Sequence, residues 1–134
     1  MKLAIAKKID DLEADCYSES TTVARSALRR LAMLADAVNL RACEVLAEFF
    51  TRAGPLSDAA AAYFWYHIVL SQEGYRVGFD NLDNTGASYL GPVGDFRNEA
   101  EVSDLVSELG FEQCRAIDER TRHWLEAHRL SYQA

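Results

Sequence analysis

The sequence predicts an all-α protein in which about six helices pair into stacked antiparallel hairpins. Apolar residues recur every three or four positions along most of the chain, and helix-ending residues separate the segments that show this period. The two central segments are too apolar for either helix to be stable alone. At 134 residues the chain is long enough to bury one core, so we expect a single domain over residues 1–134.

The central stretch, residues 42–74, is predicted to form two helices that fold back on each other. Gly54 and Pro55 separate them, and both residue types are typical just past a helix end. Ser57 is expected to cap the second helix, with Asp58 beside its positive end. The predicted core consists of apolar and aromatic residues from this stretch and from the last two helices: Leu46, Phe50, Ala62, Trp65, Tyr66, Leu105, Trp124.

Two helices are predicted before the central stretch, at 2–16 and 22–38. In the second of them, the apolar spacing places Val23 and Ala27 on the inward face. Asn39 is expected to end this helix in the left-handed conformation, which leaves a very short turn into the central pair.

The chain after residue 74 is predicted to form a long loop and then another pair of helices. Residues 75–97 hold four Gly, one Pro and two Asn, which argue against a helix, together with apolar residues that favour an ordered loop. The oxygen-bearing residues of this loop lack the spacing of a calcium-binding loop, so we predict no metal site. The last helices are expected at 99–109 and 111–128, with Gly110 between them.

The order of residues in the central stretch resembles the Sel-one-like repeat, a relative of the tetratricopeptide repeat. Small, aromatic and turn-forming residues carry this resemblance: Ala42, Leu46, Ala47, Phe50, Gly54, Leu56, Asp58, Ala62, Trp65, Tyr66, Gly74. The resemblance implies a short α/α superhelix with residues 42–74 as its central repeat. It also implies that the protein binds other proteins and does not point to a chemical reaction.

The net charge of −7 is unevenly distributed along the chain. Residues 54–110 hold two basic and nine acidic residues, whereas the two flanking parts are each balanced, so the whole excess lies in the middle. Such a negative field repels nucleic acid and anionic membranes and attracts basic proteins. The alternative is an acidic surface that serves solubility only.

A basic partner protein is expected to bind where the loop meets the following helix. The residues predicted to contact it are acidic apart from one tyrosine and one arginine: Asp80, Asp83, Tyr89, Asp95, Arg97, Glu99, Glu101.

The remaining compositional features indicate a cytoplasmic protein without a cofactor. An apolar run of only four residues, 3–6, precedes Lys7 and Lys8, which is too short for the core of a signal peptide. No segment approaches the roughly 20 apolar residues of a membrane span. The three cysteines are widely spaced, which argues against a disulfide or zinc framework and favours small buried hydrophobes.

Few residues suggest catalysis, and no common hydrolase, metalloprotease or nucleotide-binding motif occurs. His67 lies in the most aromatic helix, and Glu44 and Glu48 are one turn apart on the helix expected to face it. A small hydrolytic enzyme that uses His67 with Glu44 or Glu48 is therefore one alternative. The other interpretation is a histidine held by packing and one hydrogen bond.

We expect a non-enzymatic protein-binding module that acts as an inhibitor or immunity-type protein and occludes a basic partner, such as a toxin. Small acidic proteins that resemble this repeat family include adaptors and bacterial immunity proteins. So few repeats make a poor extended platform, which favours the inhibitor. An adaptor or scaffold of a larger assembly is the first alternative.

Overall fold

The computed structural model describes residues 2–52, 56–72, 78–79, 89–90 and 99–128; for residues 2–7, 78–79, 89–90 and 99–100 it describes the backbone alone. This part of the chain contains six α-helices, so the all-α prediction is confirmed. The helices are α1 (Lys2–Cys16), α2 (Thr21–Asp36), α3 (Leu40–Thr51), α4 (Ala59–Gln72), α5 (Glu99–Leu109) and α6 (Phe111–Ala127). Within these ranges, none of the helices combines the length and the apolar character needed to cross a membrane.

In the region predicted as a long loop, the described residues form one short two-stranded sheet. Its strands are β1 (Gly78–Phe79) and β2 (Tyr89–Leu90). They pair antiparallel, with Gly78 opposite Leu90 and Phe79 opposite Tyr89. The strand β1 lies against α6.

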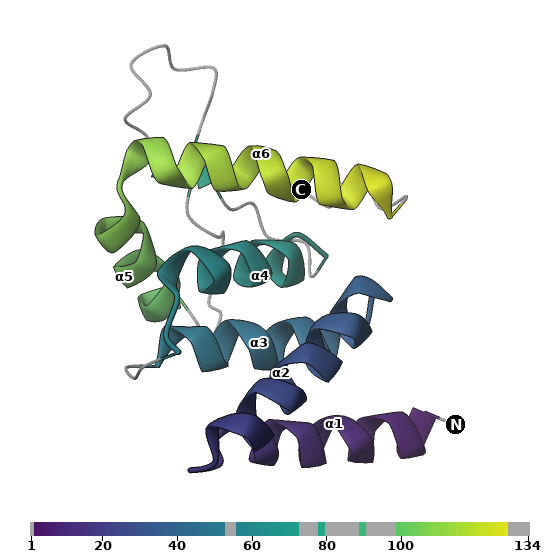
Figure 1. The fold of residues 1–134 in the computed structure, drawn as a ribbon. Helices are drawn as coiled ribbons and strands as arrows, with labels where there is room; N and C mark the ends of the chain where they lie inside the picture. The colour runs from purple at the N-terminus through teal and green to yellow at the C-terminus, as the bar shows by residue number, and fades with distance from the viewer. Residues whose placement is uncertain (1, 53–55, 73–77, 80–88, 91–98, 129–134) are drawn as a thin grey trace.

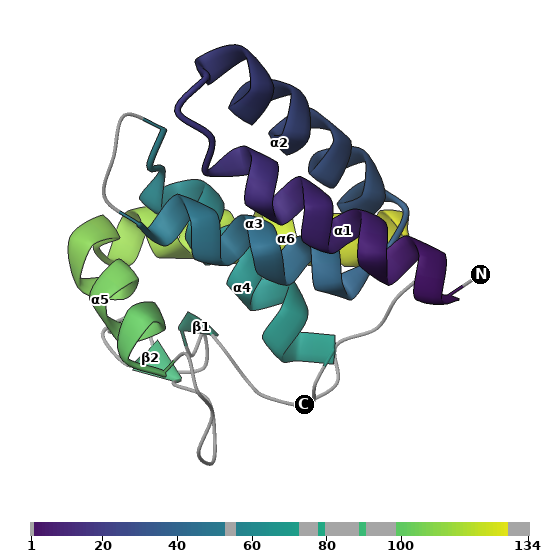
Figure 2. The same ribbon diagram turned by 90° about the horizontal axis from the view of Figure 1, so that it is seen from below.

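The helices stack in layers, with α6, α4, α3 and α1 following one another through the molecule (Figure 1). The first pair, α1 and α2, packs together and against α3 (Figure 2). The last two helices, α5 and α6, contact each other less than α1 and α2 do. Each packs on α4 instead: α5 lies against it at one end of the layers, and α6 runs along it (Figure 1). Gly110 alone joins α5 to α6, and its φ of 81° lies in the left-handed region that glycine adopts without strain.

The inward face of α2 consists mainly of alanines. Ala24, Ala27, Leu31 and Ala35 are buried and follow the helical period, so the backbone of α2 can approach its neighbours closely. The prediction that Val23 faces inward is wrong, because Val23 is 41% exposed. It lies about 100° around the helix from Ala24, which occupies the inward position instead.

The turn between α2 and α3 differs from the prediction in its left-handed residue. Val38 has a φ of 66°, and Asn39 has an extended φ of −85°. The Asn39 side chain accepts a hydrogen bond at 3.0 Å from the backbone N–H of Ala42, so Asn39 caps α3. A side-chain acceptor satisfies an N–H group that the first turn of a helix leaves free, and this favours asparagine at the cap over the left-handed position.

The cap of α4 is also one residue further along the chain than predicted. Asp58, rather than Ser57, accepts a hydrogen bond at 3.1 Å from the backbone N–H of Ala61. Both residues are suitable caps, and the carboxylate has the additional advantage of a negative charge at the positive end of the helix.

The core runs through α3 and α4, and it includes the seven predicted core residues to different degrees. Four are buried: Leu46, Ala62, Tyr66, Leu105. Three are partly buried and pack against the core: Phe50, Trp65, Trp124. The two tryptophans join α4 to α6, with ring centroids 6.2 Å apart and planes nearly perpendicular. Aromatic pairs favour this edge-to-face arrangement.

Arg41 of α3 links the first helix to the central pair. Its guanidinium group lies 3.3 Å from Glu13 and 3.8 Å from Asp10, both of α1, and 3.6 Å from Glu44. These groups are partly exposed to solvent, so each ion pair contributes at most about 1 kcal/mol to stability.

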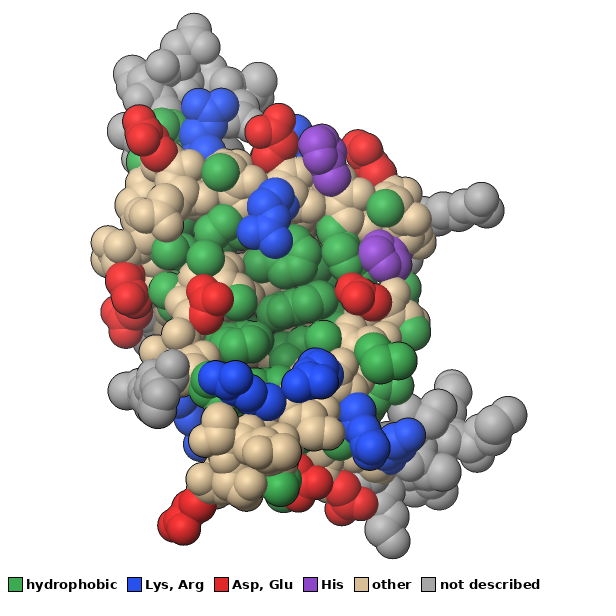
Figure 3. Space-filling view, in the orientation of Figure 1, with side chains coloured by type: hydrophobic (Ala, Val, Ile, Leu, Met, Phe, Trp, Pro, Cys, Tyr) green, Lys and Arg blue, Asp and Glu red, His purple; other side chains and the backbone are tan. Residues whose placement is uncertain are grey.

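One face of the molecule has a broad apolar area over α4 and α3, between α6 and α2 (Figure 3). Lys and Arg side chains lie along its edges on both the α6 and α2 sides (Figure 3). On the α6 side, the guanidinium of Arg120 lies 5.1 Å from the centre of the Phe64 ring, a distance that permits a cation–π interaction.

Candidate functional site

The residues predicted to bind a partner fall into two groups. Asp80, Asp83, Asp95 and Arg97 lie outside the residues that the structure describes. The other three lie on described elements: Tyr89 in β2, Glu99 at the start of α5 and Glu101 in its first turn. The backbone alone is described for Tyr89 and Glu99, so the candidate site rests on Glu101 and on the helix that carries it.

The helix α5, which lies at one end of the layers (Figure 1), is acidic. Its eleven residues include four carboxylates and no Lys or Arg. Val102 and Leu105 are buried and anchor the helix, whereas Asp104 and Glu108 are exposed on its other side. Since no cation within the helix balances this charge, the exposed face attracts cationic groups.

Glu101 extends this acidic face toward α3 and α4. Its side chain is partly buried, and its Oε2 atom is buried without a hydrogen-bond donor among the described residues. The carboxylates of Glu101 and Glu48 both raise the pKa of the Tyr66 hydroxyl, after burial, which has the largest effect. The pKa of Tyr66 reaches about 12 although a hydrogen bond with Thr51 lowers it. The hydroxyl is therefore neutral, and the charge at this junction of three helices comes from the carboxylates.

Burial raises the pKa of Glu48, and the nearby carboxylate of Glu13 raises it further, while Arg41 and Arg52 lower it. The folded protein therefore binds a proton at Glu48 more tightly than the unfolded chain does. The stability that Glu48 contributes is greatest below its ordinary pKa, and it is lost as the pH rises through the raised value.

We therefore expect Glu48→Gln to increase the free energy of unfolding at pH 7, by less than about 1 kcal/mol because the group is partly solvated. The gain should disappear below about pH 4, where Glu48 is protonated in both states. Urea unfolding at several pH values measures this, with the exposed Glu119→Gln as the matched control. A stability gain that stays constant from pH 4 to pH 7 would contradict the assigned pKa direction.

His67 is fully buried in α4, and its close partner comes from α6. Its Nδ1 atom lies 2.9 Å from Oδ1 of Asp118, and the same oxygen accepts a hydrogen bond at 2.7 Å from the Tyr63 hydroxyl. Glu44, which was expected to face His67, lies 3.6 Å from Arg41. Sequence reasoning missed Asp118, although a carboxylate four residues after the buried Cys114 borders the inward face of α6.

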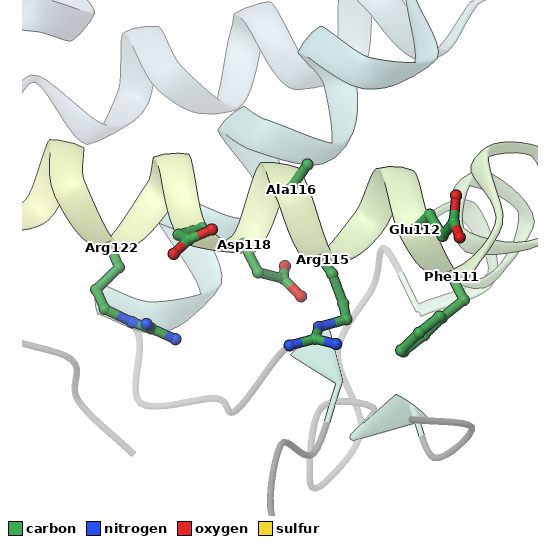
Figure 4. A pocket seen from close by; sticks show the side chains of 7 residues that line it. Phe111, Glu112, Arg115, Ala116, Asp118 and Arg122 are labelled. Carbon is green, nitrogen blue, oxygen red and sulfur yellow. The ribbon is translucent and has the colours of Figure 1, made fainter. Parts of the chain in front are cut away.

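Asp118 also lines a cavity of about 420 Å³ beside α6. Arg115 and Arg122 point to the same side of the helix as Asp118 (Figure 4). The described residues that line the cavity are Phe111, Glu112, Arg115, Ala116, Asp118, Glu119 and Arg122. His67 lies behind Asp118 with 0% of its surface exposed, so its imidazole does not reach the cavity surface.

Cys16, Cys43 and Cys114 are buried as free thiols, which confirms their predicted role as small hydrophobes. Burial raises the pKa of Cys16 to about 11, of Cys43 to about 12 and of Cys114 to about 11. Thiols with such high pKa values stay protonated at neutral pH and are poor nucleophiles. Among the described residues, no three His, Cys, Asp or Glu side chains cluster so that they could hold a metal ion.

Comparison of the chain with protein-family models, curated proteins and solved structures gives no match. The relation to the Sel-one-like repeat therefore stays a prediction, based on the residues of the central stretch.

Proposed function

We propose that this protein is a non-enzymatic binding module that recognises a basic partner protein through the acidic face of α5. The observation that supports this proposal is the composition of α5, which carries four carboxylates and no cation and lies at one end of the layers (Figure 1). Complementary charges of this kind mainly accelerate the encounter of two proteins and select the correct partner.

An inhibitory or immunity-type role fits this module better than a scaffold role. The described part has six helices, and the acidic helix α5 lies at one end of the layers (Figure 1). A short stack of helices of this size offers one binding surface, with the area of a standard protein–protein interface. Such an area is sufficient to cover the active region of a partner such as a toxin.

Burial argues against the catalytic alternative that was based on His67. A general base must lie within hydrogen-bonding distance of the proton that it abstracts. His67 is 0% exposed and its Nδ1 lies 2.9 Å from Asp118, so substrate contact would require α6 to separate from α4. An enzyme that uses His67 is therefore the weaker proposal.

The acidic face can be tested with a triple variant, Glu101→Gln, Asp104→Asn and Glu108→Gln. We expect its association rate with the partner to fall about tenfold at low ionic strength and to depend less on salt. The partner is first captured at low salt with the tagged wild-type chain, identified by mass spectrometry and purified for stopped-flow measurements.

The matched control removes three exposed carboxylates from α6 instead: Glu112→Gln, Glu119→Gln and Glu126→Gln. Equal association rates for the two triple variants would place the interface away from α5. If the purified partner keeps its own activity in the complex, the adaptor role replaces the inhibitory one.

A further inference from the structure

A second cavity lies where three segments of the chain meet, and no residue of α5 is among its described lining residues. Its volume is about 540 Å³, within the usual range of sites for small molecules. It is lined by the turn between α1 and α2, the end of α3 and the residues before α4. The described lining residues are Cys16, Tyr17, Ser18, Glu19, Thr21, Ala24, Arg25, Phe49, Arg52, Leu56 and Ser57.

One wall of this cavity is apolar and partly aromatic. The ring of Tyr17 lies 5.2 Å from that of Phe49, at a tilt of 55°. Ala24 and Leu56 add aliphatic surface beside them. Tyr17 is 38% exposed, whereas Phe49 is buried. The wall therefore offers an apolar surface to a ligand with a hydrocarbon body.

Two arginines supply positive charge at the same cavity. The guanidinium of Arg52 lies 4.6 Å from the centre of the Tyr17 ring. Stacking of this kind uses the face of the guanidinium and leaves its N–H edge free to bind an oxyanion with two hydrogen bonds. Arg25 is exposed on α2, and within the described part of the chain neither Arg25 nor Arg52 forms an ion pair with an acidic side chain.

The start of α2 strengthens the positive potential. Ser20 caps this helix by accepting a hydrogen bond from Val23, and Thr21, the first residue of α2, lines the cavity. The positive end of the helix dipole therefore lies at the cavity. Glu19 is the one acidic residue among the described lining residues and opposes this potential in part.

We propose that this cavity binds a small organic acid in which a carboxylate is attached to an apolar or aromatic body. The carboxylate pairs with Arg25 and with the free edge of Arg52, and the body packs on the wall formed by Tyr17 and Phe49. The ligand has the opposite charge to the basic partner proposed for α5, so the two proposals are tested by different measurements.

Titration with 3-phenylpropanoate, followed by NMR chemical shifts of the full chain, tests the proposal. We expect saturable binding, with shifts at residues that line the cavity. The uncharged amide of the same acid should bind at least about tenfold more weakly, because it cannot form charge-assisted hydrogen bonds to both arginines. Inorganic phosphate, which lacks the apolar body, should also bind at least about tenfold more weakly.

Variants assign the binding to the named residues. Arg25→Gln and Arg52→Gln should each weaken binding of 3-phenylpropanoate about tenfold. Glu19→Gln should strengthen it, because it removes the opposing charge. The matched control is Arg30→Gln, which makes the same charge change on another side of α2 and should leave the affinity within about twofold.

Circular dichroism and thermal unfolding establish that each variant is folded. The Arg52→Lys variant keeps the positive charge but lacks the planar guanidinium group, which binds a carboxylate through two N–H groups. The proposal is overturned by equal affinities for the acid and the amide, by equal affinities of the wild type and the Arg25→Gln variant, or by no saturable binding at all.

Discussion

Replacing Asp118 with alanine is expected to lower the free energy of unfolding by about 2–4 kcal/mol. One oxygen of Asp118 accepts a hydrogen bond from the Tyr63 hydroxyl and lies 2.9 Å from Nδ1 of His67. Both of these groups are fully buried, so water that enters from the cavity beside Asp118 replaces the carboxylate only in part. Urea unfolding of the variant and the wild type, measured side by side, gives this difference.

A double-mutant cycle separates the polar contact from the general effect of truncation. Tyr63→Phe alone should cost about 1–2 kcal/mol, since it removes one buried hydrogen bond. The double variant should lose about 1 kcal/mol less unfolding free energy than the sum of the losses in the two single variants. Asp104→Ala, at an exposed aspartate of α5, is the matched control and should cost less than about 0.5 kcal/mol. If Asp118→Ala behaves like this control, the buried contact does not hold α6 to α4.

The positions of the helices could be predicted because their signals are local. The predicted first helix, 2–16, has the same bounds as α1, and Gly110 separates α5 from α6 as expected. Apolar periodicity defines the inward face of a helix, and glycine or capping residues define its ends, so neither needs information from distant parts of the chain.

At two helix ends the structure differs from the prediction, and in each case the sequence offered two suitable assignments. Asn39 was suitable either to end α2 or to cap α3, and Ser57 and Asp58 were both suitable caps for α4. Periodicity does not decide between such neighbours, because the free energies differ by a fraction of a kcal/mol to about 1 kcal/mol. The outcome depends on how the rest of the chain positions the turn.

The polar contacts depended on the three-dimensional arrangement and could not be read from the sequence. Asp118 is 51 residues from His67, and their contact depends on α6 lying along α4. Arg25 and Arg52 line one cavity only because the end of α3 lies beside the start of α2. The acidic character of α5 was visible in the charge distribution, and the structure adds that Asp104 and Glu108 are exposed, among the acidic side chains described on this helix.

The largest single effect in the core is expected at Tyr66 rather than at Trp65, although the sequence indicated both. Four aromatic residues in succession, 63–66, point in every direction around α4, so their spacing does not show which is most buried. Tyr66 is 2% exposed, whereas Trp65 is partly buried at the edge of the core.

We therefore expect Tyr66→Ala to lower the free energy of unfolding by about 3–5 kcal/mol, which is much of the stability of a domain of this size. Trp65→Ala should cost less, about 1–3 kcal/mol, because a partly exposed ring loses less apolar contact and leaves a smaller cavity. Tyr66→Phe keeps the ring and should recover most of the loss, because it removes the hydroxyl alone. Urea unfolding of the three variants ranks the positions. If Trp65→Ala proved the more damaging truncation, α4 would have to be rotated about its axis, and the contacts assigned to His67 and Tyr63 would change with it.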